Sequence, residues 1–352
     1  MRKLLILIVF SALIYPKVFG QIGGENTYDF LNLTNSARMA ALGGNQIALN
    51  DSLDLNVSYN NPALLRPDMK NKLTVNFVDY FAGIRYGYAA YSFGTSLPGN
   101  FAVGMHYINY GNFVEALPNG EKTGATFNAA EYALNLIWSN EYGRFTYGIN
   151  LKPILSSFEN YQSIGLAADL GISLFSKNKF TVTSLVARNL GTQLTTYYDG
   201  AERESIPFDL QFGISQKLQH APIRFAATLQ HLQKWDLAKA EIDNTSYVSV
   251  VKEENFTKKF MRHMVLGVEL LPSPNFTIRA GYNHQIRQEL KLAEKMSTVG
   301  FSWGFGFRIS RFEINYGSAR YHLAGASNLI SVALNLNDDF QRKSVDETIP
   351  EN

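Results

Sequence analysis

The residue types that most often carry chemistry are sparse in this sequence of 352 residues. It has no cysteine, no H-E-x-x-H motif and no G-x-S-x-G nucleophile elbow. No two histidines stand at a metal-ligand spacing, and we interpret all six as solvated or interfacial side chains. They are His106, His220, His231, His263, His284 and His322. The sequence therefore predicts no catalytic group, no cofactor and no metal site.

The glycine-rich stretch from Thr298 to Tyr316 could suggest a phosphate-binding loop, but its pattern is that of a β-hairpin. Apolar residues occupy every second position, and the opposite positions are small or polar. The apolar positions are Val299, Phe301, Trp303, Phe305, Phe307 and Ile309, and the glycines opposite them are Gly300, Gly304 and Gly306. We expect a turn at Ser310 and Arg311. Small residues on the inner face would leave room inside a barrel for another segment.

About fourteen segments repeat this two-residue alternation between residues 72 and 336. Most have about ten or more residues, which suits a tilted strand crossing a membrane better than a soluble sandwich. The aromatic content of 13% also favours a membrane barrel, although strand propensity explains part of it. The segments are 72–79, 84–93, 100–110, 126–139, 144–155, 164–175, 179–190, 207–218, 222–233, 261–271, 275–285, 297–309, 311–321 and 326–336.

Short and long links alternate along the middle of the chain. Outer-membrane barrels have short periplasmic turns and long external loops, whereas a soluble sandwich has no reason to separate them. The short links are 140–143, 176–178, 219–221, 272–274 and 310; the long ones are 111–125, 156–163, 191–206, 234–260 and 286–296. The sequence predicts an all-β protein, a transmembrane antiparallel barrel spanning 72–336 with its loops facing the cell exterior.

The two ends of the chain do not follow the alternation. Residues 1–20 have two basic residues, an apolar run and a small-residue cleavage pattern, which predict a signal peptide. Removing it leaves 32 − 3 = 29 basic against 30 acidic residues, a balance that gives no reason to expect nucleic acid as a partner. Residues 337–352 are interpreted as a C-terminal tail.

The segment 21–71 predicts a small helical plug before the first strand. The run SARMAALGG (36–44) predicts a short helix capped by Asn35 or Ser36 and stopped by Gly43 and Gly44. The motif Asn61, Pro62, Ala63 follows. These features resemble the N-terminal hatch of the FadL-like outer-membrane barrels. The opening GGENTYDFLNLTNSARMAALGGNQIAL (23–49) is more specifically similar to the PorQ family of the type IX secretion system.

The resemblance implies a non-enzymatic barrel of an attachment complex that fixes secreted proteins to lipopolysaccharide. Its implied partners are outer-membrane lipids, a PorZ-like surface protein, a PorU-like sortase and a PorV-like shuttle barrel. A FadL-like transporter of hydrophobic small molecules is the alternative, and an outer-membrane enzyme is a third. The alternation predicts a polar inward face of the barrel. This face favours the anchor, because transport of a hydrophobic molecule needs an apolar path. Its residues are Glu131, Asn135, Asn150, Lys152, Asp209 and Gln211.

The expected external loop 234–260, which we call the candidate docking loop, has the composition of a protein-docking surface. It mixes many charges with a few apolar residues, and such a polar rim around apolar anchors suits partner binding, although a solvated loop is the simpler interpretation. The candidate anchors are Trp235, Tyr247, Val248 and Val250.

Overall fold

The computed structural model describes most of the expected barrel and plug. The described residues are 26–51, 53–80, 83–117, 119–238, 241–242, 249–250, 254–290, 298–322 and 325–336. Within them no helix has the length and apolar character to cross a membrane. The expected signal peptide, 1–20, and tail, 337–352, lie outside the described residues.

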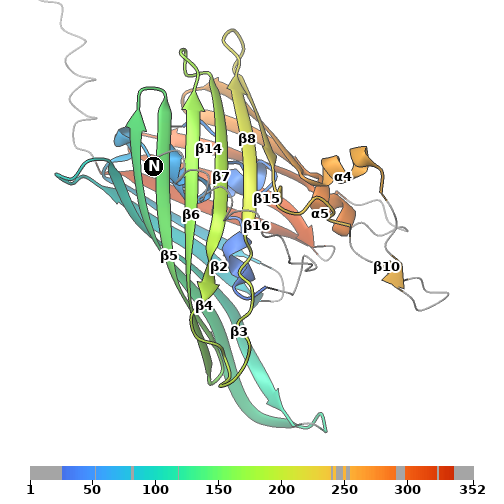
Figure 1. The fold of residues 1–352 in the computed structure, drawn as a ribbon. Helices are drawn as coiled ribbons and strands as arrows, with labels where there is room; N and C mark the ends of the chain where they lie inside the picture. The colour runs from blue at the N-terminus through green and yellow to red at the C-terminus, as the bar shows by residue number, and fades with distance from the viewer. Residues whose placement is uncertain are drawn as a thin grey trace, which may run out of the picture.

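Fourteen strands form one closed antiparallel barrel, which confirms the expected fold class (Figure 1). Each strand pairs with its neighbour along the chain, and β1 pairs with β16 from Lys72↔Asn335 onward to close the wall. Closure removes the free edges that an open sheet would expose to lipid. The barrel strands are β1 (Lys72–Asp79), β2 (Arg85–Phe93), β3 (Asn100–Ala116), β4 (Lys122–Tyr142), β5 (Phe145–Phe158), β6 (Tyr161–Phe175), β7 (Thr181–Gln193), β8 (Asp209–Lys217), β9 (Ile223–Leu229), β12 (Met264–Ser273), β13 (Phe276–Asn283), β14 (Phe301–Ile309), β15 (Phe312–His322) and β16 (Gly325–Asn335).

Five short helical turns lie between Asn26 and Asn71, and two helices lie between barrel strands. The first group is η1 (Asp29–Asn32), α2 (Ala37–Ala41), α3 (Val57–Asn60), η2 (Pro62–Leu64) and η3 (Pro67–Met69). The second is α4 (Phe256–Arg262) and α5 (His284–Glu289). A separate two-stranded sheet consists of β10 (Glu241–Ile242) and β11 (Ser249–Val250).

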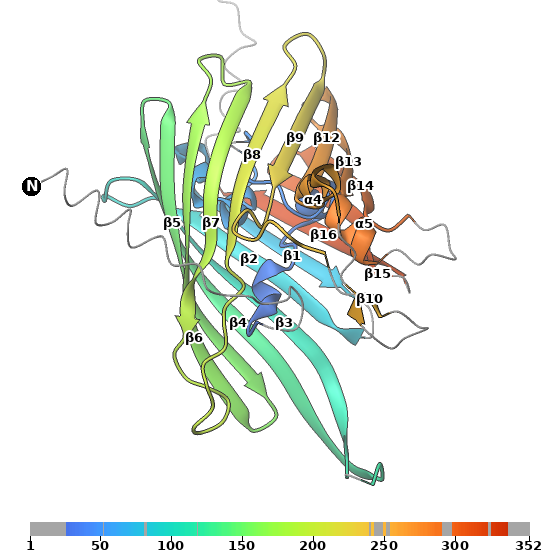
Figure 2. The ribbon, with the colours of Figure 1, turned by 45° about the vertical axis from the view of Figure 1, so that its right-hand side comes forward.

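The two ends of the barrel differ in their links. We call the end with the links 143–144, 176–180 and 218–222 the turn end, and the other the loop end, because the β7–β8 and β9–β12 links lie there. Two expected long loops, 111–125 and 156–163, are wrong in extent. The β3–β4 hairpin continues to Ala116 and projects beyond the wall, and only residues 159–160 separate β5 from β6 (Figure 2). Backbone pairing continues where the apolar alternation ends, so alternation underestimates strand length.

Several other expected strands extend beyond the observed ones: 222–233 ends at Leu229, 261–271 begins inside helix α4, and two further ends have a clear local cause. Residues 284–285 begin helix α5 instead of extending β13, because the Asn283 side chain caps that helix by accepting from the Ile286 amide. At 297–300 the described residues form a turn that needs the positive φ of Gly300, +85°, so β14 begins only at Phe301.

The outer face of the wall is apolar and the inner face is polar or small, as the alternation predicts. On β14 the Trp303 side chain is 55% exposed, while Ser302 and Gly304 face inward. On β5, Leu151 is exposed, whereas Lys152 is buried inside the barrel. The six polar residues expected to face the lumen are all buried: Glu131, Asn135, Asn150, Lys152, Asp209 and Gln211. Large exposed apolar side chains on the outer wall suit hydrocarbon.

The outward side chains of β14 give a direct test of this orientation. Trp303→Lys and Phe305→Arg should prevent assembly, because a basic residue on the lipid face near the midplane costs roughly 2 to 4 kcal/mol. The measurement is the amount of heat-modifiable barrel in purified outer membranes. Trp303→Leu is the control and should assemble normally. Normal barrel levels for the two basic variants would contradict the assigned orientation.

Candidate functional site: a plugged lumen

Residues 26–71 fill the barrel interior, and we call this segment the plug (Figure 1). At the loop end Asn26 forms a bridge with Ser205, and the Thr27 amide donates to the Ser205 carbonyl at 2.9 Å. At the turn end Asn71 leads into β1, and its amide donates to the Ser92 carbonyl at 2.9 Å. The plug therefore passes along the lumen from the loop end to the turn end before the first strand begins.

The plug helix α2 has the ends that its sequence predicts. Ser36 is the N-cap, and its hydroxyl accepts from the Met39 amide at 3.4 Å. After Leu42 the chain leaves the helix through Gly43 and Gly44, whose φ angles of +95° and +98° are favourable only for glycine. The Gly44 amide then donates to the Met39 carbonyl at 2.8 Å, satisfying a helix-end acceptor.

Helix α2 lies against inward-facing glycines of four neighbouring strands. A Cβ at Gly281 of β13 would come within 2.1 Å of the Gly43 nitrogen, and one at Gly317 of β15 within 2.2 Å of the Ala37 oxygen. Gly304 of β14 likewise faces the Ala41 methyl, and Gly267 of β12 faces Leu42. The glycines thus form a groove in the wall that lets the helix backbone approach. Hydrogen bonds of 3.0 Å from the Gly43 amide to Ser302 and 3.2 Å from Asn283 to the Gly43 carbonyl hold it there.

Only one of the three glycines singled out in the sequence makes room for the plug. Gly304 does so, as expected. Gly306 instead leaves space for the Arg279 guanidinium and the Asn315 amide of neighbouring strands, and Gly300 supplies the turn before β14. The expectation was wrong for these two because alternation shows which face a glycine occupies and not what it contacts.

The Asn61, Pro62, Ala63 motif attaches the plug to the opposite wall. The Asn61 side chain donates to the Ile47 carbonyl at 2.8 Å and to Ser173 of β6 at 3.0 Å, and accepts from the Ala63 amide at 3.0 Å. Pro62 begins the turn η2 and packs on Gly148 of β5, where a Cβ would come within 2.6 Å of the Pro62 carbonyl carbon. This motif is therefore a structural clamp.

A buried charge cluster joins the plug to the wall. The Arg38 guanidinium of α2 donates two hydrogen bonds of 2.9 Å to Glu269 of β12, and it also pairs with Asp51 at 2.7 Å and Asp54 at 3.1 Å. Glu269 also accepts hydrogen bonds from two wall arginines, Arg224 of β9 at 2.5 Å and Arg279 of β13 at 2.9 Å. Three guanidiniums thus meet three carboxylates, and removal of one member would leave buried charges uncompensated.

A second buried cluster stabilises an irregularity in the wall. The Lys152 ammonium of β5 pairs with Asp169 of β6 at 2.6 Å, and Asp169 accepts from the Asn189 backbone amide at 2.8 Å. Asn189 has a φ of +55° and lies in a β-bulge of β7 that points both Arg188 and Asn189 inward. Asp169 therefore holds the extra residue of the bulge in place.

Sequence reasoning missed both clusters. Their wall members lie at inward positions of the alternation, which could have found them. In the plug, the signal was the lone Arg38 in an otherwise small and apolar run, with Asp51 and Asp54 after it. The histidine interpretation was also partly wrong. His106 is buried, with its Nδ1 2.8 Å from the Tyr59 hydroxyl, and His263 is buried beneath the Trp235 ring. No group of three or more histidine, aspartate or glutamate side chains within the described ranges could hold a metal ion.

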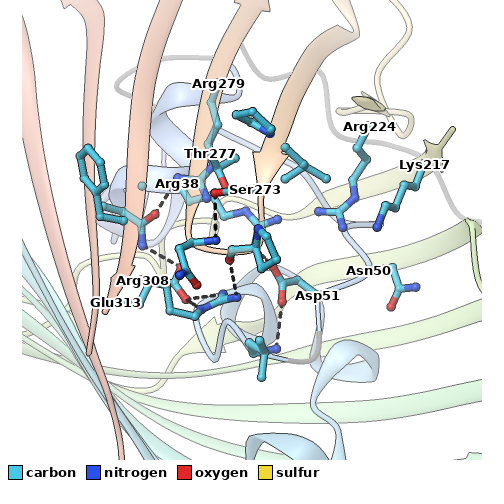
Figure 3. A pocket seen from close by; sticks show the side chains of 18 of the residues that line it. Arg38, Asn50, Asp51, Lys217, Arg224, Ser273, Thr277, Arg279, Arg308 and Glu313 are labelled. Carbon is cyan, nitrogen blue, oxygen red and sulfur yellow. Dashed lines mark hydrogen bonds and ion pairs between the residues drawn. The ribbon is translucent and has the colours of Figure 1, made fainter. Parts of the chain in front are cut away.

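Two of the cavities lined by the described residues lie on opposite sides of the plug. The turn-end cavity has a volume of about 720 Å³ and a charged lining that includes Arg38, Lys217 and Arg308 (Figure 3). The loop-end cavity has a volume of about 400 Å³ and lies beside Gly44 and Asp209, with both polar and apolar side chains around it. Helix α2 contributes to the first cavity, and the Gly43–Gly44 turn that follows it contributes to the second.

The described part of the candidate docking loop is held together by aromatic contacts. The Trp235 ring lies 5.0 Å from that of His263 and 5.5 Å from that of Phe256 in α4, and the Trp235 and Phe256 side chains are 43% and 70% exposed. Arg262 donates two hydrogen bonds of 2.7 Å to Glu254, and this contact holds the pKa of the Glu254 carboxyl below its usual value. The Val250 backbone belongs to β11, while Tyr247 and Val248 lie outside the described residues.

The closed wall and the glycine-seated plug define a plugged, closed antiparallel β-barrel. No protein-family model and no curated protein matches the chain. Two similar solved structures are deletion mutants of TodX, described as a monoaromatic hydrocarbon channel. The deltaS2 mutant is 13% identical over 87% of this chain and 100% of its own, and the deltaS2S3 mutant is 15% identical over 86% and 99%; both have a TM-score of 0.51. At these identities the likeness establishes the fold.

The glycine groove predicts a steric test of plug seating. Gly281→Val should displace the Gly43 turn, because even a Cβ at this position meets the Gly43 nitrogen at 2.1 Å. We expect a lower unfolding temperature and larger single-channel conductance in planar bilayers than for the unmodified protein. Ala280→Val on the outer face of the same strand is the matched control and should change neither. Wild-type conductance and stability in Gly281→Val would contradict a tightly seated plug.

The charge cluster predicts unequal effects of two carboxylate substitutions. Glu269→Gln leaves three guanidiniums without their shared carboxylate and should destabilise the folded barrel by roughly 3 to 5 kcal/mol. Glu313→Gln, which loses the partly exposed pair with Arg308, should cost about 1 kcal/mol or less. Urea unfolding in detergent micelles measures both. Equal losses would show that the Arg38 cluster does not fix the plug.

Proposed function

We propose that this chain is an outer-membrane barrel that anchors a surface protein in the attachment complex of a type IX secretion system. The observation that carries the proposal is the plugged lumen. Its plug is seated on glycines of one wall, clamped by Asn61 and Pro62 to the other, and tied to the barrel by the Arg38–Glu269 pair. A barrel closed in this way is suited to holding a partner rather than to conducting a solute.

The resemblance to the PorQ family supplies the proposed partners. In this proposal the loop end faces the cell exterior and binds a PorZ-like surface protein, which works with a PorU-like sortase and a PorV-like barrel. The exposed Trp235 and Phe256 rings offer an apolar contact, and charged side chains of α4 and its flanking residues surround them. Aromatic anchors inside a polar rim are typical of protein interfaces.

Transport of hydrophobic small molecules is the second candidate function. The comparisons support it better than attachment, because the two TodX structures are described as a monoaromatic hydrocarbon channel. An apolar groove of about 460 Å³ on the outer wall also lies against β12 and β13, next to Gly267 and Gly281.

The charged lining of the turn-end cavity opposes the transport function, since an apolar solute would have to pass it. The pairing of β12 with β13 is also continuous from Val265↔Asn283 to Leu270↔Ile278, so entry from the groove would need these strands to separate.

The docking proposal predicts that the exposed aromatic pair is needed for partner binding. The double substitution Trp235→Ala with Phe256→Ala should reduce recovery of a PorZ-like partner in crosslinking pulldowns from outer membranes by about tenfold or more, as expected for aromatic anchor residues. Tyr142→Ala, which removes an aromatic ring that is 82% exposed at the turn end, is the control and should leave recovery unchanged. Unchanged recovery in the double variant would refute docking at this loop.

Uptake measurements separate the two functions. Cells with and without the barrel are given a radiolabelled monoaromatic hydrocarbon, and accumulation is followed over time. Equal rates support the anchor, whereas faster accumulation that depends on the barrel supports the transporter.

A further inference from the structure

The turn-end cavity has an imbalance of charge that neither proposed function explains. Seven arginine or lysine side chains line it, against three carboxylates. Most of the arginines are already paired: Arg38, Arg224 and Arg279 share Glu269, and Arg308 pairs with Glu313 at 2.7 Å. Arg66, Lys179 and Lys217 remain to be balanced by another negative charge.

Three cations of the lining have no carboxylate partner within the described part of the chain. Lys179 lies in the turn between β6 and β7, and Lys217 ends β8; no described side chain pairs with either ammonium. Arg66 of the plug donates to the neutral Asn50 amide at 3.1 Å, and its Nε is buried without a hydrogen-bond partner. Asp68 is the one lining carboxylate left to oppose them, and it is exposed.

Two of the cations face each other across neighbouring strands. Lys217 of β8 is the register partner of Arg224 of β9, and Figure 3 shows both side chains extending toward the cavity next to one another. Like charges directly opposite each other destabilise a sheet. Arg224 uses its Nη1 on Glu269 at 2.5 Å, but Lys217 receives no such compensation. An anion between the two strands would turn this repulsion into attraction.

We propose that the turn-end cavity binds a multivalent oxyanion, a solute carrying phosphate or carboxylate groups. Ammonium and guanidinium groups form their strongest hydrogen bonds with such oxygens. The cavity volume of about 720 Å³ is that of an ordinary small-molecule site, and the opening between the short turns admits a solute from the solvent at that end. The paired arginines form the rigid rear wall, and Lys179, Lys217 and Arg66 provide the free positive charge.

Calorimetric titration of the purified full-length barrel in detergent tests the site. Pyrophosphate is the phosphate probe and citrate the carboxylate probe, each at constant ionic strength with chloride as the background anion. We expect saturable binding of at least one probe, and the tighter one identifies the preferred group. Because charge screening weakens exposed ion pairs, the affinity should fall as salt is raised. Absence of saturable binding for both probes would overturn the proposal.

Substitutions locate the binding to this cavity. Lys179→Gln combined with Lys217→Gln should weaken probe binding by about tenfold or more, because two charge-assisted contacts are lost. Lys177→Gln is the matched control: it removes an exposed lysine from the same β6–β7 turn that does not line the cavity, and it should change affinity less than about twofold. Heat modifiability confirms that each variant is folded. An equal loss in Lys177→Gln, or no loss in the double variant, would assign the binding to general surface charge and refute the site.

Discussion

The structure depends on Glu269 and the three guanidiniums that surround it. This carboxylate projects from the wall into the lumen and binds Arg38 of the plug, while Arg224 and Arg279 from adjacent strands hold it from the sides. Buried charges are tolerated only when their partners are in place, so the position of the plug and the register of β9, β12 and β13 are mutually dependent. The plug is therefore part of the fold and not a loose insert.

Glycine supplies the other half of this arrangement. Where the plug helix meets the wall, an inward-facing glycine on each of β12, β13, β14 and β15 lets the backbone of α2 approach the sheet closely. On the opposite wall, Gly148 and Gly171 accept Pro62 and Asn61. The lumen thus combines steric fit on two sides with ion pairing at its turn end, which explains how a short segment with little helix of its own is held firmly.

Much of the fold could be predicted because the physical signals are local. The two-residue alternation predicted about fourteen strands and the facing of Trp303 and Lys152. The cap candidates Asn35 and Ser36, with Gly43 and Gly44, predicted the plug helix, and Ser36 is the cap. Contacts between distant residues could not be predicted. Arg38 and Glu269 are 231 positions apart, and the inward-facing position of Glu269 in the alternation does not specify which residue it contacts. The same limit applies to the buried His106, whose partner Tyr59 lies in the plug, and to the cavity cations, whose grouping depends on which strands are neighbours in the closed wall.

The route of the plug has a consequence for how the protein is made. The chain passes through the lumen from Asn26 beside Ser205 to Asn71, and only then builds the wall, which is closed when the last strand meets the first. A folded cylinder of continuous strands offers no sideways entrance for this segment. The wall must therefore wrap around the N-terminal residues while it is still an open sheet, or those residues must thread in afterwards through an end. Wrapping would give the earliest part of the polypeptide the role of an internal template, around which the later strands take their order.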